Sequence, residues 1–156
     1  MSAGAADIFL IQPAAMSPNP ETTAEHPLKI SAEGAAWIKR VESMLSETGI
    51  ESAQLVDTEP VHQTLPATRH WKDLPTTNHT TEQAPALAQQ LKTTDLDTLV
   101  IADAEVLVDV LQTLGSKATD ADIRSHQLIH LVRMHQGKVV DTLHWNTAGG
   151  AGLTDE

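Results

Sequence analysis

The segment Asp-Thr-Leu-Val-Ile-Ala at residues 97–102 most constrains how this 156-residue chain can fold. Its apolar residues are consecutive, as in a strand buried on both faces. After it, apolar residues recur at helical spacing until Gly115, a residue that commonly ends helices. They are Val106, Leu107, Val110, Leu111 and Leu114. A buried strand that leads directly into an amphipathic helix indicates an α/β sheet, because parallel strands are joined by such helices.

Weaker signals of the same kind occur along the rest of the chain. Further strands are predicted over residues 7–12, 51–56, 127–134 and 138–143, the last two joined by the hairpin signal His-Gln-Gly. A helix is predicted from its N-cap Ser31 to Gly49, and a shorter helix over residues 84–91. Residues 15–27 and 71–80 have the composition of loops.

Strands that alternate with helices predict a three-layer α/β/α sandwich with a mostly parallel central sheet. Residues 7–12 and 97–102 are expected to be adjacent or near-adjacent parallel strands. We expect one domain over residues 1–145 and a flexible C-terminal tail over residues 146–156, which is rich in glycine. The expected core consists of Phe9, Ile11, Val56, Leu99 and Ile101 in the strands, covered by Trp37, Val41, Leu45, Val110 and Leu111 from the helices.

The charge of the chain restricts its partners. The chain contains ten Lys and Arg and twenty-one Asp and Glu, which gives a formal net charge of −11. Such a surface repels phosphate backbones and anionic lipids, which argues against nucleic-acid and membrane partners. No apolar run approaches the roughly twenty residues of a membrane span, and the N-terminus lacks the features of a signal peptide. A cytoplasmic location is therefore expected, and the absence of Cys excludes thiol chemistry.

Four short segments, in chain order, carry a resemblance to a known family. They are Leu10-Ile11-Gln12-Pro13-Ala14, residues 27–34 (Pro-Leu-Lys-Ile-Ser-Ala-Glu-Gly), Gln63-Thr64, and residues 100–107 (Val-Ile-Ala-Asp-Ala-Glu-Val-Leu). Their order and spacing resemble the histidine phosphatase (phosphoglycerate mutase-like) superfamily, especially its short phosphohistidine-phosphatase branch. The resemblance runs from about residue 7 to residue 145 and implies a phosphoglycerate mutase-like fold.

The same resemblance implies that the catalytic positions have been replaced. Family members end the first strand in Arg-His, carry a second Arg three residues before Gln-Thr, and carry a second His at the end of a later strand. By this correspondence Gln12 and Pro13 replace the first Arg and the nucleophilic His, Pro60 replaces the second Arg, and Asp103 replaces the second His, whereas Gln63 is retained. Transfer of a phosphoryl group to histidine needs an imidazole nucleophile and cationic donors around the oxygens.

The resemblance with these departures predicts a catalytically inactive pseudo-phosphatase. It would act as a protein-interaction, scaffold or regulatory subunit, with no cofactor and with a protein partner that carries a basic patch. The alternative is a phosphohistidine phosphatase-like hydrolase, or a small-ligand binder that reuses the degenerate cleft.

Histidines offer the remaining candidate chemistry. His126 and His130 are spaced so that they could share one face of a strand or helix and ligate a metal, but we expect surface or strand-edge histidines and no metal site. His62 stands near the replaced second Arg and is either an imidazole beside the pocket or a solvated loop residue.

Overall fold

The computed structural model describes residues 5–13, 16–18, 28–45, 48–56, 61, 64, 68, 71–115, 128–135 and 137–146. Within these residues six strands form one mixed sheet in the order β5-β4-β6-β1-β7-β8. They are β1 (Ala5–Ile11), β4 (Ser52–Val56), β5 (Thr76–His79), β6 (Thr98–Ile101), β7 (Leu128–His135) and β8 (Lys138–Asn146). The four strands β5, β4, β6 and β1 are parallel, and β7 and β8 extend the sheet as an antiparallel hairpin.

The main helices follow the sequence signals closely. They are α1 (Ala32–Met44), α3 (Ala84–Thr93), which a short 3-10 turn η2 (Thr81–Gln83) precedes, and α4 (Ala104–Leu114). The hydroxyl of Ser31 accepts a hydrogen bond from the Gly34 N–H at 2.9 Å and so caps α1 as predicted. Gly115 ends α4 in the left-handed conformation, with φ +94°, which glycine adopts without steric cost.

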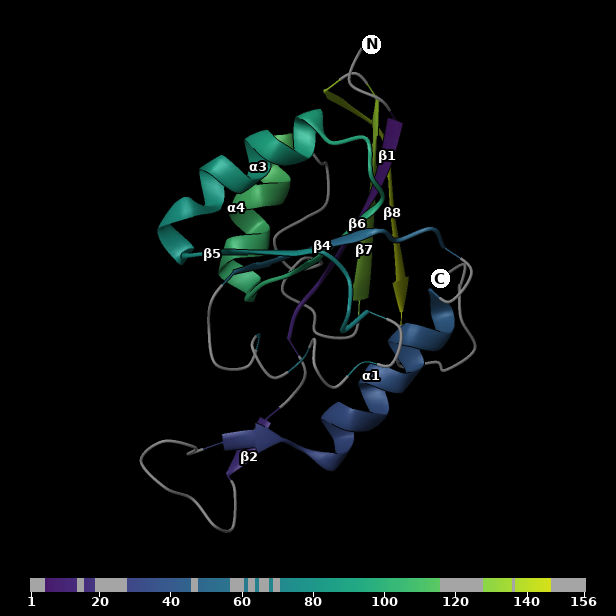
Figure 1. Ribbon diagram of the computed structural model, residues 1–156, viewed down its shortest axis with the longest axis vertical. Coiled ribbons are helices and arrows are strands. Elements are labelled where there is room, and N and C mark those ends of the chain that lie inside the picture. The colour runs from purple at the N-terminus through teal and green to yellow at the C-terminus, as the bar shows by residue number, and fades with distance from the viewer. Residues whose placement is uncertain are drawn as a thin grey trace.

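The helices cover the two faces of the sheet, which gives the predicted α/β/α layers (Figure 1). On one face, α3 and α4 pack against Ile8, Leu10 and Val100. On the other face, α1 packs against residues that alternate with these along the same strands. All ten expected core residues are buried: Phe9, Ile11, Trp37, Val41, Leu45, Val56, Leu99, Ile101, Val110 and Leu111.

The central pair of strands is the predicted one. Strands β1 and β6 are adjacent and parallel, in register from Ile8 opposite Thr98 to Ile11 opposite Ile101. All four residues of β6 are buried, as its unbroken apolar run indicated.

Two predicted loops contain short strands. Within residues 71–80, β5 pairs in parallel with β4 as the sheet edge. Within residues 15–27, β2 (Met16–Pro18) begins a separate antiparallel pair with β3 (Leu28–Ile30), which lies away from the main sheet in Figure 1. Both predictions were wrong because neither segment shows an apolar alternation. Three of the four β5 residues are exposed, so the strand depends on backbone pairing.

Helix α1 also ends before the predicted stop at Gly49. Leu45 is its C-cap, and the N–H and hydroxyl of Thr48 both donate to the Leu45 carbonyl, at 3.1 and 2.7 Å. This turn satisfies a carbonyl at the helix end that would otherwise lack a partner, so the chain leaves the helix four residues early. No helix in the described part of the chain is long and apolar enough to cross a membrane.

Candidate functional site

The predicted site residues of the first and fourth segments lie together at the carboxyl ends of the strands. Strands β1 and β6 end side by side, and the Ala102 N–H donates to the Ile11 carbonyl at 3.2 Å immediately beyond the last register pair. Gln12 and Pro13 therefore continue from β1 next to the residues that continue from β6, which include Asp103. Ligand sites of open α/β sheets occupy this edge, at the carboxyl ends of the strands.

Asp103 has a specific place in this arrangement, as the N-cap residue of α4. Its backbone is extended (φ −62°, ψ 158°), and its carbonyl accepts the first helical bond from the Leu107 N–H at 3.0 Å. Its carboxylate makes no capping bond to the helix. Glu105 in the first turn places a second carboxylate near the same helix end, where the helix dipole favours negative charge. Two carboxylates therefore lie at the start of α4.

The two residues after β1 add no positive charge. Gln12 is half-buried and presents an amide, which can both donate and accept hydrogen bonds. Pro13 is buried, and its side chain offers neither a nucleophile nor a hydrogen-bond donor. Among the described residues, these strand ends thus contribute the amide of Gln12 and the carboxylates of Asp103 and Glu105.

The third strand of this edge is β4, which ends at Val56. Pro60, Gln63 and His62, which follow it, lie outside the described residues, so their positions relative to Gln12 and Asp103 stay predictions. Two neighbours are described and buried: Val61 packs in the same cluster as Ile11 and Ile101, and Thr64 is 1 % exposed. The chain after β4 thus contributes to the α1 side of the core.

The prediction of a surface or strand-edge histidine was wrong for His130, which is buried on β7, between β1 and β8. It lies opposite Leu10 and His144 in the two ladders. His79 at the end of β5 bonds through Nε2 to the Gln54 side chain. His126 lies outside the described residues. Among the residues that the structure describes, no group of three or more His, Asp or Glu is arranged to hold a metal ion.

A charged cluster that the sequence did not single out lies at the opposite edge of the sheet. The Asp7 N–H donates to Asp97 Oδ1 at 3.0 Å, and Arg133 Nε lies 3.3 Å from Asp7 Oδ1. Burial raises the pKa of Asp7 above its ordinary 3.8, and the nearby Asp97 raises it further, against the opposing effect of Arg133. The available signal was an acidic residue at the start of each of two apolar runs. Because this cluster is at the amino ends of the strands, it is separate from the edge that carries Asp103.

No protein-family model matches the sequence, and no curated protein matches it. Solved structures do match. The protein histidine phosphatase SixA, complexed with tungstate, is 12% identical, with a TM-score of 0.67 over 92% of this chain and 98% of that one. Phosphoglycerate mutase from Plasmodium falciparum is 12% identical, with a TM-score of 0.60 over 98% and 96%. Alpha-ribazole phosphatase from Shigella flexneri is 8% identical, with a TM-score of 0.62 over 96% and 100%.

These matches cover nearly the whole of each chain, so the similarity concerns the overall fold and not a short shared motif. Their low identity makes them evidence of fold and not of activity. The α/β chain described above therefore has the fold of the histidine phosphatase superfamily, with SixA-type phosphohistidine phosphatases among its structural neighbours.

Proposed function

We propose that this chain is a catalytically inactive histidine-phosphatase-like domain that acts through protein interaction, as a scaffold or regulatory subunit. The observation that carries the proposal is the pair of residues at the ends of β1 and β6. By the resemblance noted in the sequence, Pro13 and Asp103 correspond to the two catalytic histidines of that family. They follow β1 and β6, which are adjacent parallel strands. The family mechanism needs a phosphorylated imidazole at the first position, and proline has no atom that can take that role.

The electrostatics of the edge support the same proposal. A phosphoryl group that enters near α4 meets Asp103 and Glu105, in a protein whose net charge is −11. Gln12 replaces a guanidinium with a neutral amide. Loss of one preorganised donor typically reduces the rate by about 10²–10³. Here the nucleophile is replaced as well, so turnover by the family mechanism should fall to background.

The decisive experiment measures turnover of a phosphohistidine peptide and of p-nitrophenyl phosphate by protein purified to homogeneity. We expect no hydrolysis above background, and no rise in melting temperature with inorganic phosphate, since only ligands of the native state raise it. Turnover that disappears in Gln12→Ala or Asp103→Ala would overturn the proposal in favour of a hydrolase that reuses the cleft. Phosphate binding that Gln12→Ala abolishes would support a small-ligand site instead.

A matched pair of variants distinguishes the effect of the Asp103 carboxylate on phosphate binding from the effect of the overall charge. Asp103→Asn removes one negative charge from the start of α4, and Asp109→Asn removes one from its exposed side. If Asp103 is what repels phosphate, Asp103→Asn should show measurable phosphate binding and Asp109→Asn should not. Equal behaviour of the two variants would mean that Asp103 has no special influence on this edge.

The same charge defines the expected kind of partner. An excess of eleven negative charges favours a partner with a basic surface, and such an association weakens as salt screens it. Partners recovered with the purified protein should therefore dissociate as ionic strength rises. A partner that binds equally well at low and high salt would contradict this part of the proposal.

A further inference from the structure

Strand β8 forms a long edge of the sheet. Among the described strands it pairs only with β7, so its other side presents backbone N–H and C=O groups. The opposite edge strand, β5, has four residues where β8 has nine. A long edge is a template on which an extended segment of another protein can add a strand.

A slip in the ladder divides β8 into two parts. Arg133 pairs with Asp141 but the next residue, Met134, pairs with Val139, so Val140 is an extra residue. Such a bulge bends the strand and discourages edge pairing at that point. Beyond it, the register runs without a break from Asp141 to Asn146. The part of the edge suited to a further strand is therefore this six-residue stretch.

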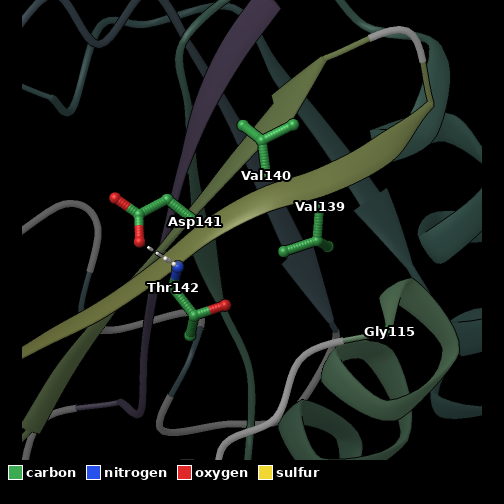
Figure 2. Close-up of a pocket in the computed structure, with 5 residues that line it drawn as sticks. All are labelled: Gly115, Val139, Val140, Asp141 and Thr142. Atoms are coloured by element: carbon green, nitrogen blue, oxygen red, sulfur yellow. Dashed lines mark hydrogen bonds between the residues drawn. The ribbon is translucent and has the colours of Figure 1, made fainter.

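A cavity of about 360 Å³ opens next to the bulge, lined by Gly115 at the end of α4 and by Val139, Val140, Asp141 and Thr142 of β8. Figure 2 shows Val139 pointing toward the α4 side and Val140 pointing away from it. A Cβ placed on Gly115 would meet nothing within 4 Å, which shows how much open space the helix end leaves. The cavity is open on one side, and Asp141 and Thr142 make part of its wall polar. Its volume leaves room for one side chain of an added segment, with Val139 as an apolar contact.

The other side of β8 offers a different surface. Val140 is 62 % exposed and Leu143 is 39 % exposed, and Asp141 is an exposed carboxylate beside them. Side chains of an added strand alternate between the two faces. Every second side chain of the added strand would lie on the α4 side, where the cavity is. The remaining side chains would contact Val140, Leu143 and Asp141.

From these features we infer that the Asp141–Asn146 edge of β8 binds an extended, basic segment of a partner protein by strand addition. The inference rests on the proposed role of the chain as an interaction domain, and it names the surface and the partner. An apolar residue of the segment enters the cavity, and Lys or Arg residues face Asp141. A second copy of this chain is disfavoured as the occupant, because it would bring another eleven negative charges to the edge.

The test uses a fluorescein-labelled peptide of about eight residues with alternating lysine and valine, long enough to span Asp141–Asn146. Fluorescence anisotropy should show saturable binding. The same peptide with N-methylated backbone amides should bind at least about tenfold more weakly, because it cannot donate to the edge. Hydrogen exchange should show new protection of backbone amides within Asp141–Asn146. Absence of binding, equal binding of the N-methylated peptide, or protection confined to other strands would overturn the inference.

A matched pair of variants locates the contact. Leu143→Lys on β8 and Thr77→Lys on β5 make the same change of charge at exposed positions on the two edges. Only Leu143→Lys should weaken binding of the peptide, by about tenfold. If Leu143→Lys does not fold, Val140→Lys takes its place in the comparison. Equal effects of the two edge variants, or self-association that the peptide competes away, would refute the assignment. Either failure would leave the turnover result, measured separately, unaffected.

Discussion

Replacement of Leu107 by alanine should be among the most damaging single changes to this protein. Leu107 is fully buried in α4, in the cluster that joins α3 and α4 to β1 and β6. Its N–H also donates to the Asp103 carbonyl in the first turn of the helix. Truncation of a buried leucine to alanine typically costs about 2–5 kcal/mol, through lost burial and the cavity left behind. With no exposure at this site, we expect about 3 kcal/mol.

The measurement is urea denaturation followed by tryptophan fluorescence, which the buried Trp37 and Trp71 report. For a domain of this size, about 3 kcal/mol corresponds to a melting temperature lower by about 6–12 °C. Leu96→Ala is the matched control, because Leu96 is 41 % exposed and undergoes the same chemical change. The control should stay within about 0.5 kcal/mol of the parent protein. Similar losses in both variants would refute the packing of α4 on the sheet, and with it the placement of Asp103 at the edge.

Two further predictions concern the stability of the folded protein. Ser31→Ala should destabilise the protein by about 1 kcal/mol, because the Gly34 N–H loses its acceptor, and Ser31→Thr should restore most of this loss; thermal melts of the three proteins decide it. The raised pKa of Asp7 means that its contribution to stability is greatest at acid pH and is lost as pH rises through that pKa. Relative to Asp7→Asn, the parent should therefore lose stability in urea titrations as pH rises from below the ordinary 3.8 of an aspartate through the raised pKa. A difference between the two proteins that is independent of pH would contradict this assignment.

The sequence predicted the centre of the sheet well because buried parallel strands and amphipathic helices leave a strong local signal. The run at residues 98–101 is buried at every position, and α4 shows its apolar stripe without interruption. Short edge strands give no such signal. In β5, Thr76, Thr77 and Asn78 are exposed, and what makes them a strand is the neighbouring edge of β4. That pairing is a property of the tertiary structure, which a local pattern cannot express.

The site was predictable only in the part that follows directly from strand order. Once β1 and β6 are parallel neighbours, their next residues must emerge together, so Gln12 and Asp103 lie at one edge. By contrast, the Asp7 and Asp97 cluster depends on the register between two strands that stand far apart in sequence. No spacing within either segment reveals it. The cavity beside Gly115 likewise lies next to the slip at Val140, which no residue pattern in β8 marks.

The contacts that hold the carboxyl ends of β1 and β6 together are made by the backbone. The Ala102 N–H bonds the Ile11 carbonyl and the Leu107 N–H bonds the Asp103 carbonyl, whatever side chains stand at these positions. Pro13 follows the last register pair of β1, so its missing N–H removes no bond from the ladder with β6. Backbone contacts of this kind, and the apolar residues before them, can be kept while the side chains at the strand ends differ. Structural similarity therefore extends over nearly whole chains at 8–13% identity.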